Sequence, residues 1–223
     1  MRILAIDTST AYFTLGIYDA GKVYEYNLEL GRKLSALLHS VIKQALEAAS
    51  LSVKDIDYFA CGLGPGSFTG MRIGIACAKG LSWARKKPVI GICSLDILAK
   101  NAPRAPGEII VAIDAKRSLI YCGIFNNKSG RLIRKQSYKL LSADSLEKII
   151  KPGSLILGDG LSLYREKFLK AASGVKFLDK DCWYPKAHNL IELALERIKT
   201  KKLDNPFTLN PLYLYPQDCQ VKK

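Results

Sequence analysis

The chain has 223 residues, 48% of them apolar, and carries 34 basic against 20 acidic side chains, a formal net charge of +14. That length and apolar content allow one large domain or two compact ones, each with a buried core. The positive excess is larger in residues 101–223, where 22 basic side chains accompany 12 acidic ones. It favours an anionic partner, with RNA the natural candidate, although solubility alone would explain it equally well.

The cysteines and the N-terminal residues indicate a cytoplasmic protein. The six cysteines form no Cys-x-x-Cys pair, and four lie in apolar runs, which is typical of small buried residues in a reducing compartment. The first apolar run reaches Asp7 too soon for a signal peptide, and no later run is long enough to cross a membrane. The cysteines are Cys61, Cys77, Cys93, Cys122, Cys182 and Cys219.

The first hundred residues carry alternating strand and helix patterns. Three apolar runs joined by short turns predict an antiparallel meander, and leucines recurring every three or four residues predict an amphipathic helix after it. In chain order, the expected elements are strands 2–7, 12–18 and 23–30, helix 33–49, strand 56–61, helix 70–86, strand 89–93 and a helix that opens at Ser94.

The same order begins again after a proline-bearing connector at 101–107, which indicates a domain boundary. The expected elements are strands 108–113, 119–125 and 131–140, a turn at 126–130, helix 142–150, strand 154–157, helix 161–172, strand 175–178 and helix 186–201. The repetition predicts a duplicated α/β protein, β-β-β-α-β-α-β-α in each half, with Asp7 and Asp114 ending the two first strands. The expected domains are residues 1–104 and 105–223, with the last segment free to pack back on the first domain.

A glycine-rich segment with the sequence LGPGSFTGMRIG, residues 63–74, joins strand 56–61 to the next helix. Its composition suggests a phosphate-binding loop, but no lysine stands at the P-loop offset and the glycines do not fit the dinucleotide fingerprint. We interpret it as a tight turn shaped by Gly64, Pro65 and Gly66, in which Ser67 and Thr69 cap the helix.

The two helices at 33–49 and 70–86 are candidates for a protein interface. Helix 70–86 is apolar or small on nearly every side, so most of its surface must be covered. Its small residues Gly74, Ala76, Ala78 and Gly80 would permit a close helix–helix approach. Burial inside its own domain is the alternative, and the pattern leaves both open.

No catalytic or metal-binding set of residues stands out. The two histidines, His39 and His188, lie in separate predicted helices with no Cys or His neighbour at ligand spacing. No Ser-His-Asp or Cys-His arrangement can be argued, which disfavours a peptidase. Basic and aromatic residues alternate through 116–139, a pattern that suits RNA contacts or an ordinary solvated strand face.

Several segments together resemble the TsaB family, whose members are bacterial partner subunits in tRNA threonylcarbamoyladenosine synthesis. The most specific is the glycine-rich segment at 63–74. The others are residues 3–10 (ILAIDTST), 78–81 (AKGL), 114–117 (DAKR), 158–160 (GDG) and 211–214 (PLYL). The resemblance covers nearly the whole chain and implies two duplicated actin-like, or ribonuclease H-like, lobes of the actin, hexokinase and Hsp70 superfamily.

The resemblance also implies a function. A TsaB-like chain would be a non-catalytic subunit that holds the catalytic subunit TsaD in an active conformation and cooperates with the ATPase subunit TsaE. The complex transfers a threonylcarbamoyl group from its adenylate to the adenosine beside the anticodon of tRNA. Homodimers through the same apolar surface are expected when TsaD is absent. The expected interface residues are Leu34, Leu38, Val41, Ile42, Ser67, Phe68, Thr69, Arg72, Ile75, Ala78 and Lys79.

No cofactor is firmly implied. In the superfamily, acidic residues at equivalent strand ends help to hold Mg²⁺ and nucleotide phosphates, so ATP or ADP with Mg²⁺ at the lobe or subunit interface is an expectation. Its candidate residues are Asp7, Asp114, Gly158 and Asp159. The alternative is that Asp7 bonds the turn that follows it and that Asp114 pairs with Lys116 or Arg117.

One segment departs from the family pattern. Many TsaB sequences resemble His-Ser-Glu-x-Leu-Leu-Pro in the first helix, where this chain has LSALLHS from Leu34 to Ser40. Because the His, Glu and Pro of the family pattern are absent, we expect that helix face to be more purely apolar and not to have a polar role. Two other functions stay open: a stand-alone ATP-dependent phosphotransferase of the same superfamily, which would need Asp7, and a tRNA-binding module in the basic second half.

Overall fold

The structure, a computed structural model, describes residues 1–128 and 131–216, so the end of the predicted turn at 126–130 and Cys219 lie outside the described residues. The chain divides into two compact units. The first comprises Met1–Ile97 with Pro185–Pro211, and the second comprises Leu98–Tyr184 with the residues beyond Pro211. No helix in residues 1–128 or 131–216 has both the length and the hydropathy of a membrane span.

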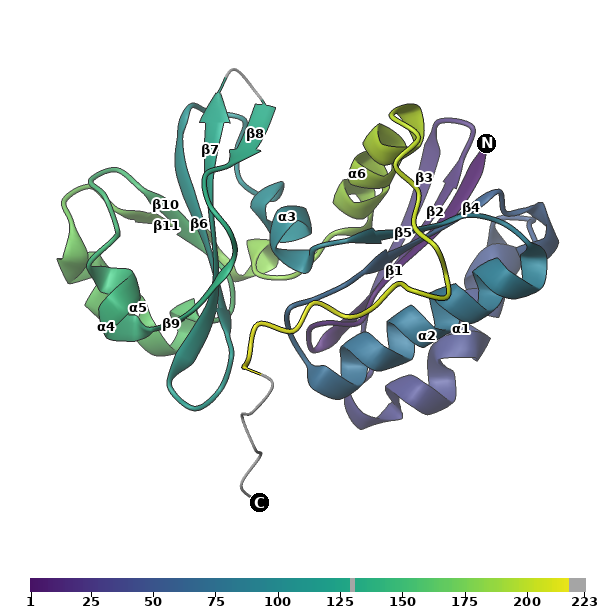
Figure 1. Ribbon diagram of the computed structural model, residues 1–223, viewed down its shortest axis with the longest axis horizontal. Helices are drawn as coiled ribbons and strands as arrows, with labels where there is room; N and C mark the ends of the chain where they lie inside the picture. Colours follow the sequence, from purple (N-terminus) through teal and green to yellow (C-terminus); the bar gives the residue numbers. More distant parts are fainter. Residues whose placement is uncertain (129–130, 217–223) are drawn as a thin grey trace. The chain divides into compact units, whose positions relative to one another are not determined.

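The described strands of the first unit form a five-stranded sheet in the order β3-β2-β1-β4-β5 (Figure 1). β1 pairs antiparallel with β2, with Leu4 opposite Ile17, and parallel with β4, with Leu4 beside Phe59. The meander expected at the start of the chain is therefore confirmed. The strands are β1 Arg2–Asp7, β2 Tyr12–Asp19, β3 Lys22–Glu29, β4 Tyr58–Gly62 and β5 Val89–Ile92.

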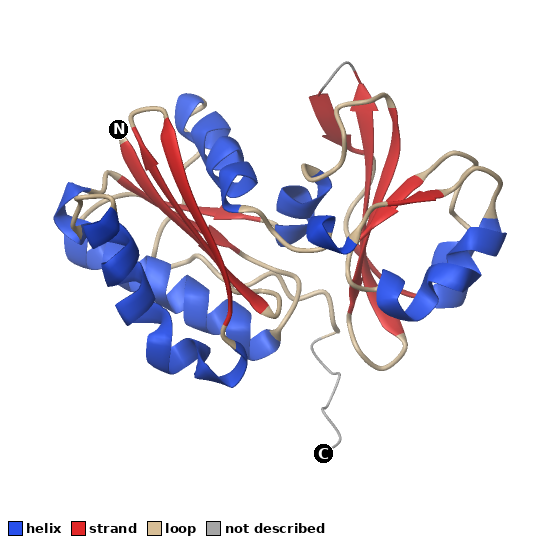
Figure 2. Cartoon of the chain, turned by 180° about the vertical axis from the view of Figure 1, so that it is seen from behind, coloured by secondary structure: helices blue, strands red, loops and turns tan. Residues whose placement is uncertain are grey.

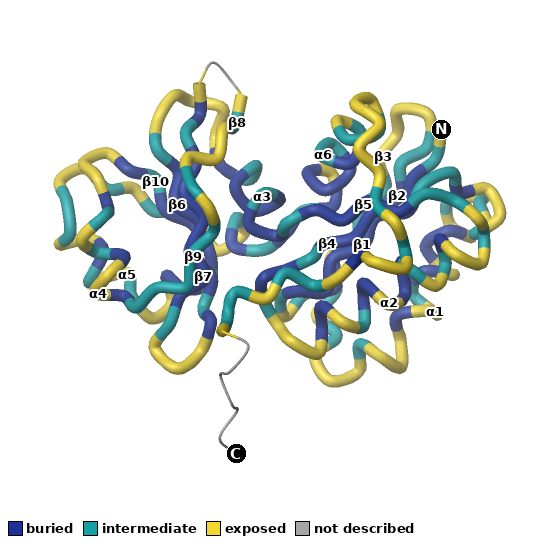
Figure 3. The backbone as a smooth tube through the Cα atoms, viewed as in Figure 1, coloured by how far each residue is buried: buried dark blue, intermediate teal, exposed yellow. Residues whose placement is uncertain are grey.

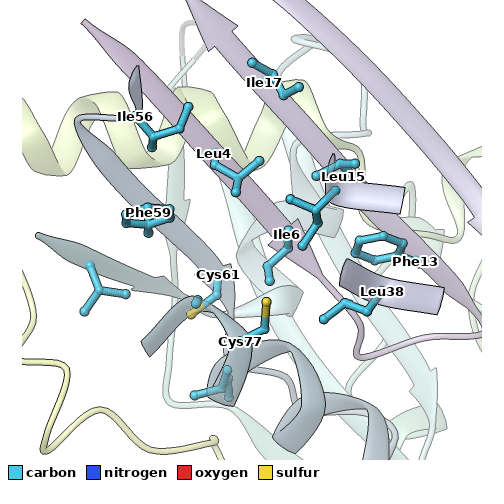
Figure 4. Close-up of a cluster of buried hydrophobic side chains, with 14 of the residues drawn as sticks. Leu4, Ile6, Phe13, Leu15, Ile17, Leu38, Ile56, Phe59, Cys61 and Cys77 are labelled. Atoms are coloured by element: carbon cyan, nitrogen blue, oxygen red, sulfur yellow. The ribbon is translucent and has the colours of Figure 1, made fainter. Parts of the chain in front are cut away.

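Helices cover both faces of this sheet, as the ribbons show (Figure 2). Because strand side chains alternate between faces, Leu4 and Ile6 pack in one cluster with residues of α1 (Leu34–Ala48) and α2 (Phe68–Arg85), as Figure 4 shows. Ile3 and Ala5 point the other way and pack against α6 (Ala187–Lys199). α1 and α2 thus share one side of the sheet and α6 covers the other.

The second unit contains a six-stranded sheet, again counted over the described residues, in the order β11-β10-β6-β7-β8, with β9 also paired to β7. The single strand expected at 131–140 is therefore two short strands. The strands are β6 Gly107–Asp114, β7 Leu119–Lys128, β8 Arg131–Arg134, β9 Lys139–Ser142, β10 Leu155–Leu157 and β11 Lys176–Phe177.

The remaining helices are short. They are α3 Ser94–Ala99, α4 Ala143–Glu147 and α5 Leu161–Ala171, with 3₁₀ turns at Gly31–Lys33, Val53–Asp55 and Lys180–Cys182. α6 follows the last strand of the second unit along the chain but belongs to the first unit, because it packs on β1, β2, β4 and β5.

Candidate functional site

The glycine-rich segment fits closely against the end of β1. Gly64 has φ +83°, a left-handed conformation that glycine adopts without strain. Further along, a Cβ atom would overlap the Ser9 carbonyl oxygen if placed at Gly66, and the Thr8 carbonyl oxygen if placed at Gly70. These glycines are needed because the chain after β1 lies directly against the loop and the first turn of α2.

Hydrogen bonds within the protein occupy donors of this loop. The Ser67 N–H donates to the Ser9 carbonyl at 2.7 Å, and the Gly64 N–H donates to Ser94 Oγ at 3.1 Å. Ser67 Oγ accepts from the Gly70 N–H at 3.2 Å, which confirms Ser67 as the cap of α2, whereas Thr69 lies inside the helix. These bonds fit a structural turn, the interpretation drawn from the spacing, better than a phosphate cradle.

Asp7 lies in the core next to this loop. Its carboxylate is 1% exposed and accepts from the Ser9 N–H and from Ser94 Oγ, each at 2.7 Å. Burial raises the pKa of the Asp7 carboxyl above its usual range, against the opposing effect of the bonds from Ser9 and Ser94. Both oxygens already have protein donors, so this geometry fits a carboxylate that ties the Ser9 turn together better than a Mg²⁺ ligand.

Asp114 and Asp159 come together at the end of β6 in the second unit. The Asp114 N–H donates to Asp159 Oδ1 at 2.8 Å, and the Asp114 carboxylate forms an ion pair with Lys116 Nζ at 2.5 Å. Gly158, at φ +117°, lies against the Ala112 carbonyl. Burial is the main cause that raises the pKa of the Asp159 carboxyl. The pairing of Asp114 with Lys116 is the structural alternative considered above, and it leaves neither oxygen of Asp114 without a protein donor.

One face of α2 is exposed along the helix, as the burial colours show (Figure 3). Phe68 is 55% exposed, and the Arg72 guanidinium lies 3.7 Å from the centre of its ring. A cation–π contact of this kind at an exposed site contributes about 0.5–1 kcal/mol. We call this face the α2 stripe; it consists of Phe68, Thr69, Arg72, Ala76 and Gly80.

Comparison with known proteins decides the family. A family model described as "TsaD: tRNA N6-adenosine threonylcarbamoyltransferase" matches residues 29–202. The protein "tRNA threonylcarbamoyladenosine biosynthesis protein TsaB" of Buchnera aphidicola (Schizaphis graminum) is 32% identical over 85% of this chain and 90% of its own length. The chain belongs to the TsaB family.

Further relatives agree with the TsaB assignment over the full chain. The TsaB protein of Escherichia coli is 28% identical over 96% of this chain and 94% of its own length. Two solved structures from Pseudomonas aeruginosa, one described as YeaZ and the other as similar to peptidase YeaZ, are each 26% identical and have TM-scores of 0.81 and 0.82. Each comparison covers 96% of this chain and 99% of the other. The expected α/β fold in two units, each with its own sheet, is confirmed, with one difference: the helix expected at 186–201 packs in the first unit.

Some of the interface residues expected from the TsaB resemblance are buried inside the first unit. Leu38, Ile42, Ile75 and Ala78 are at most 3% exposed and pack in the core of the first unit, so a partner cannot touch them while the fold is intact. Leu34 and Val41 are half-buried against the same core.

The other expected interface residues lie at the surface. Ser67, Phe68, Thr69 and Arg72 are exposed. Lys79 is half-buried, and its Nζ donates to the Leu209 carbonyl at 2.9 Å. Sequence reasoning named Ala76 and Gly80 as small residues suited to close helix approach, but it did not separate them from the buried Gly74 and Ala78 or include them among the expected interface residues. Their spacing of four and eight residues from Arg72 was the signal that could have found them.

The small residues of α2 divide between two environments. Gly74 lies against the Thr8 side chain and Ala78 is 2% exposed, so these two serve packing inside the TsaB fold. Ala76 and Gly80 face outward, and a Cβ atom at Gly80 would meet nothing within 4 Å. Of these four residues, Ala76 and Gly80 are the two that could allow a partner helix to come close.

The two histidines each contact a side chain within the first unit, and the basic stretch at 116–139 includes buried aromatic residues. His39 Nε2 lies 4.0 Å from Cys77 Sγ, and His188 Nδ1 lies 2.7 Å from Glu25 Oε2. Within residues 1–128 and 131–216, no three His, Cys, Asp or Glu side chains converge as metal ligands. In the basic stretch, Tyr121 and Phe125 are buried, which fits a strand face with core aromatics better than a stacking surface for RNA.

Proposed function

We propose that this chain acts in tRNA threonylcarbamoyladenosine biosynthesis as a non-catalytic subunit that docks on TsaD through the α2 stripe. The names of its relatives support the pathway. The observation that carries the docking role is the exposed face of α2, because Phe68 and Arg72, in contact with each other, stand at one end of a surface of small residues. Such a surface allows another helix to approach closely.

The loop geometry supports a scaffold role. α2 is fixed to β1 through the Ser67 N–H bond to Ser9 and the Thr8 Oγ1 bond to the Gly70 carbonyl at 2.7 Å. A helix held by both its core face and its first turn presents a preorganised surface, which reduces the entropy cost of binding. TsaE and tRNA would then join through the complex, and a homodimer through the α2 stripe would form when TsaD is absent.

Co-purification with TsaD from the same organism tests this proposal. Ala76→Arg places a charged side chain in the middle of the stripe, and we expect it to weaken the complex about tenfold or more, since an unpaired charge buried in an interface costs several kcal/mol. Ala48→Arg is the matched control, because Ala48 is an exposed helical alanine of α1 outside the stripe. Ala78 is unsuitable because its burial would turn the same test into an unfolding experiment.

Two results would contradict the proposal. Recovery of TsaD by the Ala76→Arg chain at the unmodified level would remove the stripe from the interface. Transferase turnover by the chain alone, supplied with tRNA and threonylcarbamoyl-adenylate, would contradict its non-catalytic role.

A further inference from the structure

A second surface lies at the far end of α2, beyond the stripe. The C-terminal turn of α2 and the segment after α6 line an open groove of about 630 Å³ within the first unit. Its main lining residues are Trp83, Lys86, Lys87, Pro88, Pro206 and Phe207. In Figure 1 the segment after α6, in yellow, passes α2 on its way to the chain end.

The groove exposes two large aromatic side chains. Trp83 is 65% exposed and Phe207 is 73% exposed, whereas Phe13 and Phe59 in the core of the first unit are buried almost completely. Exposed tryptophan and phenylalanine in a concave site are the residues that contribute most to protein interfaces when they are covered. The two prolines add apolar surface that cannot change conformation easily.

The backbone around the groove is already hydrogen-bonded. The end of α2 is closed by the Lys86 N–H bond to the Trp83 carbonyl at 3.1 Å and the Lys87 N–H bond to the Ser82 carbonyl at 3.0 Å. On the other wall, the Phe207 N–H donates to Asn205 Oδ1 at 2.8 Å. The groove is therefore preformed, and recognition must come from its side chains: an apolar surface and lysines.

The charge of the groove selects the partner. Among the described lining residues none is acidic, and Lys86 and Lys87 contribute positive charge at the rim. Lys87 Nζ lies 3.6 Å from Asp57 Oδ1, which offsets part of that charge, whereas Lys86 is exposed. Complementary charge guides association and suppresses wrong partners.

We propose that this groove binds a protein segment that carries an apolar anchor side chain flanked by acidic residues. The anchor would pack between Trp83 and Phe207, and the acidic residues would meet Lys86 and Lys87. Single-stranded RNA fits less well, because a groove that follows its backbone needs a longer row of cations than Lys86 and Lys87. Trp83 lies about 10 Å along α2 from Ala76, two helical turns away, and one turn from Gly80, so the groove adjoins the end of the stripe and a substitution at Ala76 leaves the groove itself unchanged.

Tryptophan fluorescence tests the groove in the whole chain. The chain has two tryptophans; Trp183 is 6% exposed, so a change in emission on binding would come from Trp83. The probes are an acidic peptide, EELFEE, its basic counterpart KKLFKK, and a short oligouridylate. We expect a saturable blue shift with EELFEE, at least about tenfold tighter than with KKLFKK.

Variants separate the groove from the stripe. Phe207→Ser and Lys86→Glu should each weaken EELFEE binding about tenfold, and Trp83→Phe should remove the signal. Leu163→Ser, at another exposed apolar side chain, and Ala76→Arg should leave binding unchanged. Equal affinity for the two peptides, no saturable shift, or binding of oligouridylate alone would overturn the proposal. These outcomes are independent of whether TsaD binds the α2 stripe.

Discussion

Asp7 is the residue on which three segments of the first unit converge. Its carboxylate bonds the Ser9 turn after β1 and the Ser94 hydroxyl at the start of α3, and that hydroxyl accepts from Gly64 in the loop. Gly62 has no side chain because a Cβ atom there would overlap the Asp7 carboxylate. The strand end, the loop and α3 thus depend on one buried acid.

We expect Asp7→Ala to destabilise the fold, because it leaves the Ser9 N–H and the Ser94 hydroxyl unpaired in the core, at roughly 1–3 kcal/mol for each group. Asp7→Asn keeps one acceptor oxygen, for Ser9, but replaces the oxygen that accepts from Ser94 by a donor, and it removes the buried charge, so we expect a clearly smaller loss at pH 7 than in Asp7→Ala. Urea unfolding of both variants measures this difference. Loss of stability in Asp7→Asn as large as in Asp7→Ala would refute it.

The raised pKa of Asp7 gives these variants a pH signature. Between the usual aspartate pKa of about 4 and the raised value, the folded chain binds more protons than the unfolded chain. Stability therefore falls as pH rises through this window. The unmodified chain should lose stability relative to Asp7→Asn in the same window, and parallel pH profiles would contradict the assigned direction.

At the scale of a single element, α2 shows which features of a helix the sequence pattern predicts and which it does not. The helix expected at 70–86 runs from Phe68 to Arg85, and its Ser67 cap was correctly expected. Its exposed face was not predicted, because apolar and small residues lie on nearly all sides and only the spacing of Ala76 and Gly80 from Arg72 marks one face. Trp83 is 65% exposed while Ser82 is 1% exposed, the reverse of what hydropathy indicates. Packing against Thr8 and Ser9 decides the orientation, and that contact joins residues about sixty positions apart.

Two glycines of α2 should respond in opposite ways to the same substitution. Gly80→Ala adds a methyl group in open space, and we expect it to raise the free energy of unfolding by roughly 0.5–1 kcal/mol, since alanine is the better helix former. Gly74→Ala drives its Cβ into the Thr8 side chain, and we expect a loss of about 1–3 kcal/mol from overpacking. Denaturant unfolding of the two variants gives the sign of each. A stabilising Gly74→Ala would mean that Thr8 can move aside freely.

At the scale of the whole molecule, α6 completes a unit from which it is distant in sequence. Its amphipathic pattern predicts a helix but would suit either sheet. Gly16 in β2 favours packing of α6 on the first sheet. A Cβ atom at Gly16 would lie 2.7 Å from the Cβ of Ala187, so the missing side chain makes room for the helix. The domain boundary expected between residues 104 and 105 was placed at the proline-bearing connector. The local sequence there carries no sign of the long-range contact between β2 and α6.

The segment after α6 also protects the edge of the first sheet. Arg197 Nη1 donates to the Gly91 carbonyl at 2.6 Å, and the Gly91 N–H donates to Asp204 Oδ2 at 2.8 Å. Arg197 and Asp204 are themselves joined at 3.1 Å. Together these side chains bond the outer edge of β5 in place of a further strand. Covering an edge in this way prevents pairing with another chain.

The unit that folds on its own should therefore be discontinuous in sequence. We predict that residues 1–97 joined by a flexible Gly/Ser linker to residues 185–211 unfold in one cooperative transition, because α6 and the segment after it cover the second face and the β5 edge. Residues 1–104 alone keep every strand of the sheet but expose Ile3, Ile90 and Ile92, and should aggregate. Calorimetry and light scattering distinguish the two. A cooperative, monomeric fragment 1–104 would show that α6 is an addition to a complete domain and would favour the boundary drawn at the connector.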